Sequence, residues 1–270
     1  MIDDDGFARI QLVQAERWLP HPYAVRILEE LELVLRQPKI SGAPIGRAII
    51  GRSGAGKTTL LKRFVEEHRN DEGGCPPLFI NTPPGPNLNA LLSAILEAVN
   101  DFKPGARTAS EKMNRVLRIL GELRPPMSIF DEAQNLAEGT EKQSRNCINA
   151  IKTISNNTGT PTILSGTGDL IPVISYDDQY LRRWRPIRLE VYPDGQDFVG
   201  LVNAMVAKIP LKKQDGLLAP SAYRKLYKYS EGVIGLLKEI LIKATVEAIR
   251  DGSEKLTVNH IRPILDTIES

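Results

Sequence analysis

The chain has 270 residues, 41% hydrophobic and 25% charged, which is the composition of an ordinary soluble protein with room for one large and one small domain. Its net charge of +2 excludes a strong general attraction to nucleic acid or an anionic membrane, so DNA binding would need local clusters. Cys75 and Cys147 are isolated and the three histidines are scattered, which excludes a zinc pattern or a disulfide framework. The isolated cysteines predict a reducing compartment. The acidic start, and the lack of any apolar run of about 18 residues, predict a soluble cytoplasmic protein with no membrane partner.

Short apolar runs alternate with helical periodicities between about residues 45 and 192. The expected strands are, in chain order, AII (48–50), PLFIN (77–81), MSIF (127–130), TILS (162–165) and IRLEV (187–191). The expected helices lie near residues 57–70, 87–100, 109–123 and 141–156. Strands that are buried on both faces and joined by helical crossovers predict a parallel α/β sheet.

The strand signal stops at the turn cluster YPDG (192–195), and helical periods continue to residue 268. The longest of these, SEGVIGLLKEILIKATVEAIRDG (230–252), ends at a glycine. We therefore expect a small helical lid at the C-terminus. The predicted parts are an N-terminal segment (1–25), an α/β domain (26–193) and the lid (194–270).

The stretch GRSGAGKTT (51–59) fits the P-loop pattern G-x-x-x-x-G-K-[ST] and lies between an apolar run and a helical period, as a P-loop requires. The N–H groups of such a loop suit the β-phosphate of ATP, and Lys57 suits its β- and γ-phosphate oxygens. The Thr58 hydroxyl would bind Mg²⁺. The alternative is a glycine-rich turn with a solvated lysine. The predicted ATP-binding residues are Gly51, Ser53, Gly54, Ala55, Gly56, Lys57, Thr58 and Thr59.

Two adjacent carboxylates, Asp131 and Glu132, follow the apolar run of PPMSIFDEAQNL. This places them at the carboxyl edge of a buried strand, where ligands bind in open parallel sheets. We expect Asp131 to complete the Mg²⁺ site with Thr58, and Glu132 to polarise the water that attacks ATP. The alternative for such a pair is a helix N-cap.

The next strand, in PTILSGTGDL, ends in small polar residues. Either Ser165 or Thr167 can orient the water between the γ-phosphate and Glu132, and we assign this sensor role to Thr167. The alternative for each residue is a turn with local hydroxyl hydrogen bonds.

Arginines gather in YLRRWRPIRLEVY, where Arg182, Arg183 and Arg185 precede the last expected strand. A guanidinium at this point can project into the nucleotide site of a neighbouring subunit and stabilise the transferring phosphoryl group. The alternative is an exposed basic rim with Trp184 packed as an anchor of the core.

With these motifs together, the chain resembles the TniB/TnsC-type AAA+ ATPases of bacterial DNA transposition, and TniB most closely. The resemblance runs from a lead-in with aromatic residues, prolines and a helix to the start of the lid. Its segments are ERWLPHPYAVRILEELELVL (16–35), DEAQNL, SGTGDL, YLRRW and SEGVIGLLKEIL.

The resemblance implies a P-loop AAA+ fold with a five-stranded parallel sheet of order 5-1-4-3-2, and makes Arg183 the arginine finger. It implies an ATPase of the bacterial cytoplasm that uses ATP and Mg²⁺ and assembles as a ring or helix on double-stranded DNA. It further implies that the assembly directs a DDE transposase to target sites, with a TniQ-type target-selection protein as a further partner.

One departure leaves other functions open, because Leu236 stands where related proteins often carry a lid arginine that touches the γ-phosphate. Either Lys238 substitutes for that arginine or the contact is missing. The alternatives are therefore a nucleotide-bound scaffold with negligible hydrolysis and an ATPase of the replication-initiator or helicase-loader kind.

For DNA, the loop before the helix at 109–123 carries Lys103, Arg107 and Thr108, which suit contacts to phosphates. Similarity to the pore-facing loops of the family supports this assignment. The alternative DNA surface is the helix face with Arg115 and Arg118, for which we favour a solvated face.

Overall fold

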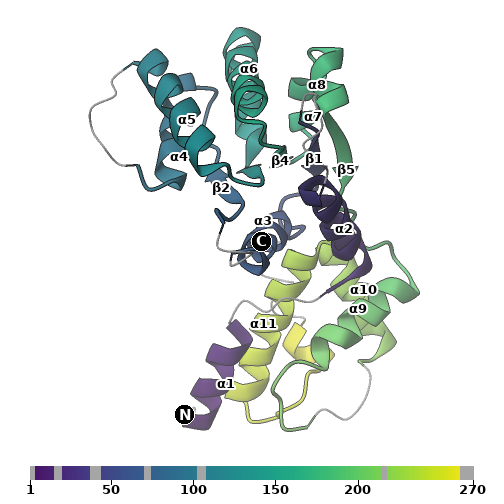
Figure 1. Cartoon of the computed structure of the whole chain (residues 1–270). Helices are drawn as coiled ribbons and strands as arrows, with labels where there is room; N and C mark the ends of the chain where they lie inside the picture. The colour runs from purple at the N-terminus through teal and green to yellow at the C-terminus, as the bar shows by residue number, and fades with distance from the viewer. Residues whose placement is uncertain are drawn as a thin grey trace. The chain divides into compact units, whose positions relative to one another are not determined.

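The computed structural model of the chain forms two compact units (Figure 1). The residues that it describes are 4–14, 20–36, 44–69, 74–101, 108–213 and 218–261. The unit that we call the core unit consists of Pro22–Ser53 and Lys57–Leu189. The lid unit consists of the described residues of Met1–His21, Gly54–Gly56 and Glu190–Ser270.

The core unit contains a five-stranded sheet in which every pairing is parallel. The strand order β2-β3-β4-β1-β5 confirms the order 5-1-4-3-2. Because Asn81 pairs with Asp131 and Ile50 with Gly166, four strands end at one edge of the sheet. The strands are β1 (Gly46–Ile50), β2 (Leu78–Asn81), β3 (Ser128–Asp131), β4 (Thr162–Gly166) and β5 (Trp184–Arg188).

Strand β5 begins three residues earlier than the expected 187–191, so that expectation was wrong in its bounds. The strand starts at Trp184, which is fully buried, pairs with Gly46 and donates its indole N–H to the Thr162 hydroxyl at 2.8 Å. As an edge strand, β5 exposes most of its other residues and accommodates Pro186, which lacks an N–H group.

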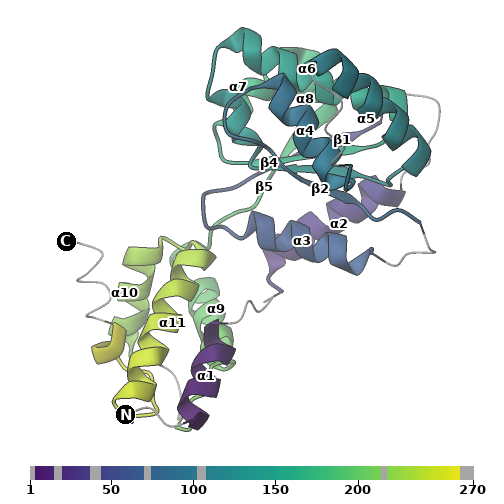
Figure 2. The ribbon, with the colours of Figure 1, turned by 90° about the vertical axis from the view of Figure 1, so that its left-hand side faces the viewer.

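Helices cover both faces of the sheet (Figure 2). One face carries α2 (Pro22–Arg36) and α3 (Lys57–Glu67), and the other carries three helices from the β2–β3 and β3–β4 connections. These are α4 (Leu88–Ala98), α5 (Ala109–Leu123) and α6 (Glu141–Thr158). Short helices η2 (Ala133–Ala137), α7 (Leu170–Ile174) and α8 (Asp178–Arg183) follow β3, β4 and α7.

The hydrophobic core lies between the sheet and the helices α4, α5 and α6. Ile80, Phe130 and Leu164 from neighbouring strands are buried against Leu92 and Ile151 of these helices. Side chains buried on both faces of each central strand explain why the strands read as continuous apolar runs in the sequence.

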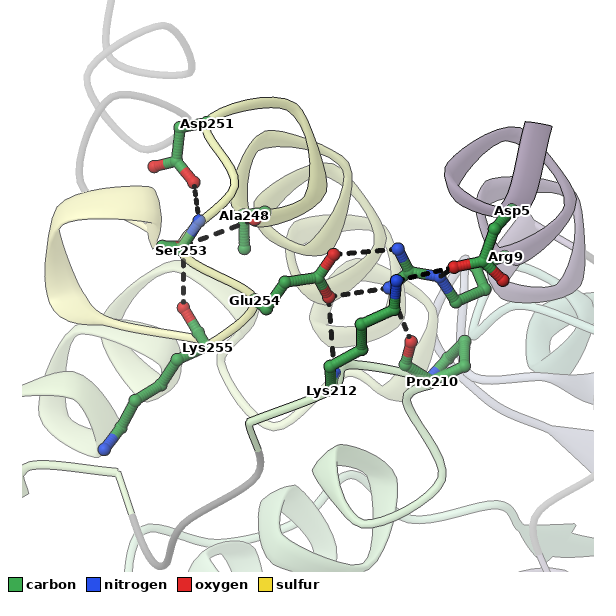
Figure 3. Close-up of polar contacts among 9 residues, drawn as sticks. All are labelled: Asp5, Arg9, Pro210, Lys212, Ala248, Asp251, Ser253, Glu254 and Lys255. Carbon is green, nitrogen blue, oxygen red and sulfur yellow. Dashed lines mark hydrogen bonds and ion pairs between the residues drawn. The ribbon is translucent and has the colours of Figure 1, made fainter. Parts of the chain in front are cut away.

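The described part of the lid unit is helical, with α1 (Asp4–Gln14), α9 (Gln196–Val206), α10 (Pro220–Ser230) and α11 (Ile234–Arg250). The N-terminal helix α1 packs against α11. Arg9 forms two hydrogen bonds to Glu254, at 2.6 and 2.8 Å, and Lys212 forms an ion pair with Asp5 at 2.8 Å (Figure 3). The Arg9–Glu254 contact joins residues that are 245 positions apart in the chain. Of the helices described, none is long and apolar enough to cross a membrane.

Candidate functional site

The P-loop follows β1 directly, and its backbone needs glycine. Gly54 and Gly56 have positive φ angles of 74° and 92°, a conformation that side-chain-bearing residues rarely adopt. The N–H of Gly51 donates to the carbonyl of Gly166 at the end of β4, at 3.1 Å. Helix α3 then begins at Lys57, so the unpaired N–H groups of its first turn directly follow those of the loop. The sequence-predicted loop residues are thus brought together at the edge where the strands end.

Lys57 is buried, with 6% of its surface exposed, and its ammonium group donates to carbonyl oxygens of its own loop. The acceptors are Gly51 at 2.8 Å and Arg52 at 3.1 Å. Burial lowers the pKa of Lys57, while the nearby carboxylates of Glu132 and Asp131 act in the opposite direction. The lysine therefore holds a partly desolvated positive charge whose hydrogen-bond partners are neutral, and a polyphosphate would match it.

The middle of the P-loop belongs to the lid unit, together with the start of α11. The N–H of Gly235 donates to the carbonyl of Gly54 at 2.9 Å, and a Cβ at Gly235 would lie 2.5 Å from that oxygen. The backbones therefore approach as closely as they do only because position 235 is a glycine. Ser53 and Gly54 are exposed, Ala55 is buried, and Thr59 is half-buried.

Asp131 ends β3 and is 1% exposed. One carboxylate oxygen accepts from the Thr58 hydroxyl at 2.6 Å, and the other accepts from the Ser165 hydroxyl at 2.8 Å. The structure thus joins the two predicted Mg²⁺ ligands, one from the P-loop and one from β3. Oxygen donors of this kind fit Mg²⁺, which is usually held by one or two protein groups together with substrate phosphates. The described residues contain no cluster of three or more His, Cys, Asp or Glu that could enclose a metal alone.

Glu132 has a left-handed backbone, with φ 53° and ψ 34°, which is a strained conformation for a residue with a side chain. It precedes η2 in the N-cap position, but its side chain makes no capping hydrogen bond, so the N-cap alternative does not describe it. The side chain is exposed and accepts a hydrogen bond from the amide of Gln134. The carboxylate is therefore accessible to solvent beside the P-loop lysine.

The two sensor candidates at the end of β4 have different contacts. Ser165 is fully buried, and its hydroxyl donates to Asp131. Thr167 is half-buried, and its hydroxyl donates to Asp169 at 2.9 Å. The Thr167 N–H donates to the amide oxygen of Gln134 at 3.2 Å. Sequence reasoning missed Gln134, whose only signal was its place two residues after the acidic pair.

The arginine cluster divides into one buried and several exposed side chains. Arg183 is 8% exposed and donates to the Ser155 hydroxyl at 3.0 Å and to the Asn156 amide oxygen, both on α6. Burial lowers its pKa. Arg182 and Arg185 are exposed. A role of Arg183 in a neighbouring site stays a prediction, and it requires the side chain to leave α6.

The predicted DNA-contacting loop falls mostly outside the described residues, because Lys103 and Arg107 lie between residues 101 and 108. Thr108 is the N-cap of α5 and forms a capping box. Its N–H donates to the Glu111 carboxylate at 3.0 Å, and its hydroxyl accepts from the Glu111 N–H at 3.2 Å. In the lid, Leu236 occupies the position where related proteins often carry an arginine, and its side chain is exposed. Lys238, the residue that could substitute for that arginine, is half-buried.

The alternative DNA surface on α5 is largely neutralised. Arg115 is bound to Asp101 through two hydrogen bonds, with 18% and 13% of the two side chains exposed. Arg118 forms an ion pair with Glu122 at 3.1 Å. Arg115 is therefore not the solvated residue that we expected.

The family model described as bacterial TniB protein matches residues 9–194, more than half of the chain. No curated protein is similar to the chain in sequence. Solved structures with the same fold include the ORC1 protein of Aeropyrum pernix in complex with DNA, with TM-score 0.72 and 20% identity over 96% of this chain and 69% of that one.

The ORC2 protein of Aeropyrum pernix, solved as ADPNP-ADP complexes, has TM-score 0.65 and 19% identity over 94% of this chain and 71% of its own. Cdc6p of Pyrobaculum aerophilum has TM-score 0.60 and 18% identity over 95% and 69%. These likenesses establish the P-loop AAA+ fold that the sequence predicted.

Proposed function

Because the chain belongs to the bacterial TniB family and has the AAA+ fold, we propose that it is an ATP-hydrolysing regulator of DNA transposition. In this proposal it assembles on double-stranded DNA and directs a DDE transposase to target sites. The observation that carries the enzymatic part is the direct contact between Thr58 and Asp131 at 2.6 Å, beside a buried Lys57.

Each residue of the site has a role in hydrolysis. The P-loop N–H groups and Lys57 bind the phosphates of ATP. Thr58 and Asp131 would hold Mg²⁺, which supplies positive charge to the phosphate oxygens when it is bound. Glu132 orients a water molecule and accepts its proton as the water oxygen bonds to the γ-phosphorus. The bond from that phosphorus to the bridging oxygen breaks, and ADP leaves with the oxygen.

Assembly is part of the proposal because an arginine supplied in trans can complete an ATPase site of this kind. A neighbouring subunit would supply the charge, as a ring or helical oligomer allows. Arg183 is our candidate, and the exposed Arg182 is the next.

DNA binding is proposed from the family and from a fold neighbour, the ORC1 protein, that was solved in complex with DNA. Lys103 and Arg107 would contact phosphates, so each subunit brings few cations and affinity comes from repetition along the duplex. A double Lys103→Ala, Arg107→Ala variant should lower both the affinity and its salt dependence, measured by anisotropy with a saturating ATP analogue. An unchanged salt slope would place the DNA surface elsewhere. A TniQ-type protein is a further proposed partner.

The central test uses two variants of the ATP site in ATPase and DNA co-sedimentation assays. Lys57→Ala should abolish ATP binding and assembly, because it removes the charge that faces the phosphates. Glu132→Gln should keep ATP binding, stop hydrolysis and form longer-lived DNA complexes. Wild-type turnover in Glu132→Gln would disprove the role of Glu132 as the base.

A second candidate function is a nucleotide-bound scaffold with negligible hydrolysis, and the exposed Leu236 favours it because no arginine occupies that position of the lid. The rate of ATP turnover by the wild-type protein on DNA separates the two functions. A rate no higher than that of Lys57→Ala would support the scaffold.

A further inference from the structure

We propose that Gln134 is a positioning residue, which sets the orientation of the Glu132 carboxylate and links it to the end of β4. This proposal rests on the proposed ATP hydrolysis. Gln134 lies in η2, the short helix that follows β3, and is half-buried beside the P-loop edge of the sheet.

The two ends of the Gln134 amide contact two parts of the site. Its nitrogen donates to the carboxylate of Glu132, and its oxygen accepts from the N–H of Thr167 at 3.2 Å. One neutral side chain therefore connects the proposed base to the strand end that carries the predicted sensor. An amide suits this connection because it holds a carboxylate by a hydrogen bond and leaves its negative charge in place.

The backbone around Gln134 is arranged to admit this side chain. A Cβ at Gly166 would lie 2.7 Å from the Gln134 amide oxygen and 3.0 Å from its backbone nitrogen, so a larger residue at position 166 would displace it. Glu132 has the strained left-handed backbone, which turns its side chain back toward position 134. Strain of this kind persists only where the surroundings enforce it, and it gathers at functional sites.

Asn135, the next residue of η2, also has a side-chain amide and can be compared with Gln134. Its nitrogen donates to the carbonyl of Thr82 after β2, at 2.9 Å. Short helix η2 thus binds the chain after β2 through Asn135 and the end of β4 through Gln134. Of these two amides in the described structure, Gln134 is the one that contacts Glu132.

The orientation of a base matters because the proton can be transferred only within hydrogen-bond reach of the water. If Gln134 holds Glu132, its loss should reduce the catalytic step and leave ATP binding intact. Thr167 is contacted through its backbone, so movement of the end of β4 when ATP binds would reach Glu132 through the same amide.

The experiment measures kcat and KM for ATP in the full chain with DNA and Mg²⁺. Gln134→Glu keeps an acceptor for Thr167 and removes the donor to Glu132, and Gln134→Met removes both. We expect kcat to fall about tenfold in each variant, since a misplaced catalytic group costs one to two orders of magnitude, with KM changed less than about twofold.

Asn135→Asp is the matched control, because it removes the same donor group from the same helix. The Asn135 side chain donates to Thr82 rather than to Glu132, and its backbone hydrogen bond to the Glu132 carbonyl is kept. We expect its kcat to stay within about twofold of wild type. The coupling is tested by adding Gln134→Met to Glu132→Gln, where the residual single-turnover rate should not fall further.

Three outcomes distinguish a failure of the role of Gln134 from a failure of the proposed ATP hydrolysis. Unchanged or higher kcat in both Gln134 variants, with Glu132→Gln inactive, overturns the role of Gln134 alone. An equal loss in Asn135→Asp also overturns it, because the effect would then come from the helix. If the wild-type protein turns over ATP no faster than Lys57→Ala, the proposed hydrolytic function fails, whatever the Gln134 variants show. Thermal unfolding of each variant identifies misfolding, and Gln134→Glu alone decides if Gln134→Met does not fold.

Discussion

The carboxylates at the P-loop edge of the core unit and those that contact α1 or its neighbours in the lid unit have opposite kinds of partner. In the lid unit, Glu254 is bound by Arg9 and Asp5 by Lys212, so that each negative charge has a positive partner. In the core unit, Asp131 accepts from two hydroxyl groups and Glu132 from an amide, and neither has an ion pair among the described residues. Both networks are well hydrogen-bonded, but one is neutralised and the other retains its charge.

The difference distinguishes contacts that hold the fold from contacts that serve a ligand. A buried charge without an opposite partner is costly, and it persists where function requires it. Arg183 shows the same feature with the other sign, because its hydrogen-bond partners on α6 are a serine and an asparagine. We infer that the charges of Lys57, Asp131, Glu132 and Arg183 are available to a nucleotide, its cation or a neighbouring subunit. The charges of the Arg9–Glu254 and Lys212–Asp5 pairs are not.

The largest effect is expected when a charge of the core unit is removed. Asp131→Asn keeps the side-chain shape and an acceptor for one of the two hydroxyls but loses the charge, so kcat should fall on the order of 10⁴-fold, because metal coordination contributes several kcal/mol. Turnover of ATP across a range of Mg²⁺ concentrations measures it. The matched control is Glu254→Gln in the lid, which should leave kcat within about twofold of wild type. Comparable losses in both variants would contradict the distinction between the units.

The next effect concerns Arg183. If its charge acts on a neighbour, Arg183→Ala should lower kcat on the order of 10³-fold, the lower end for an arginine supplied in trans, while nucleotide binding persists. Mixing this variant with Lys57→Ala protein should restore part of the turnover, since a shared site needs one residue from each subunit. Restoration by Arg182→Ala instead, with Arg183→Ala at the wild-type rate, would assign the role to Arg182.

A smaller effect, on stability rather than turnover, is expected in the lid. Arg9→Met leaves the Glu254 carboxylate, whose side chain is 13% exposed, without its guanidinium. The free energy of unfolding should fall by about 2 kcal/mol, as for a buried group that loses a charged hydrogen-bond partner. Denaturant unfolding followed by circular dichroism measures the loss, and adding Glu254→Gln should recover part of it. Equal stability of Arg9→Met and wild type would show that the Arg9–Glu254 contact adds no net stability.

The smallest effect is a pH dependence in the lid. The backbone N–H of Ser253, with help from the side chains of Ser253 and His260, lowers the pKa of Asp251 from 3.8 to about 2. A lowered pKa in the folded state adds stability that is present above pH 3.8 and is lost as the pH falls toward 2. The difference in unfolding free energy between wild type and Asp251→Asn should therefore shrink between pH 5 and pH 3. A difference that does not change with pH would assign the effect to lost packing.

The sequence predicted the parts of the fold in which one physical signal dominates. The central strands lie near their expected positions because they are buried on both faces, and the α5 bounds were correct because Thr108 and Glu111 form a capping box. The predicted position of β5 was wrong because this edge strand exposes Arg185, Pro186 and Arg188. With these residues in it, the strand does not read as an apolar run in the sequence.

The functional site was predictable in its motifs but not in its connections. Lys57, Thr58 and Asp131 meet as the motifs require. The contacts of Gln134 were not predicted, because an amide two residues after an acidic pair is not a recognisable sequence motif. They also depend on the close approach of Gly166, which the sequence does not show. The docking of α1 on the lid escaped for another reason, since it depends on an ion pair between residues 245 positions apart.

The indole that begins β5 gives the molecule a built-in optical reporter. The chain has two tryptophans, and Trp18→Phe would leave Trp184 as the single long-wavelength fluorophore. The Arg183 guanidinium carbon lies 5.9 Å from the centre of the Trp184 ring, and the indole N–H is bound to Thr162 in the dry interior. Departure of that cation toward a neighbouring subunit would change the field at the ring, so emission could follow assembly in real time without an attached dye.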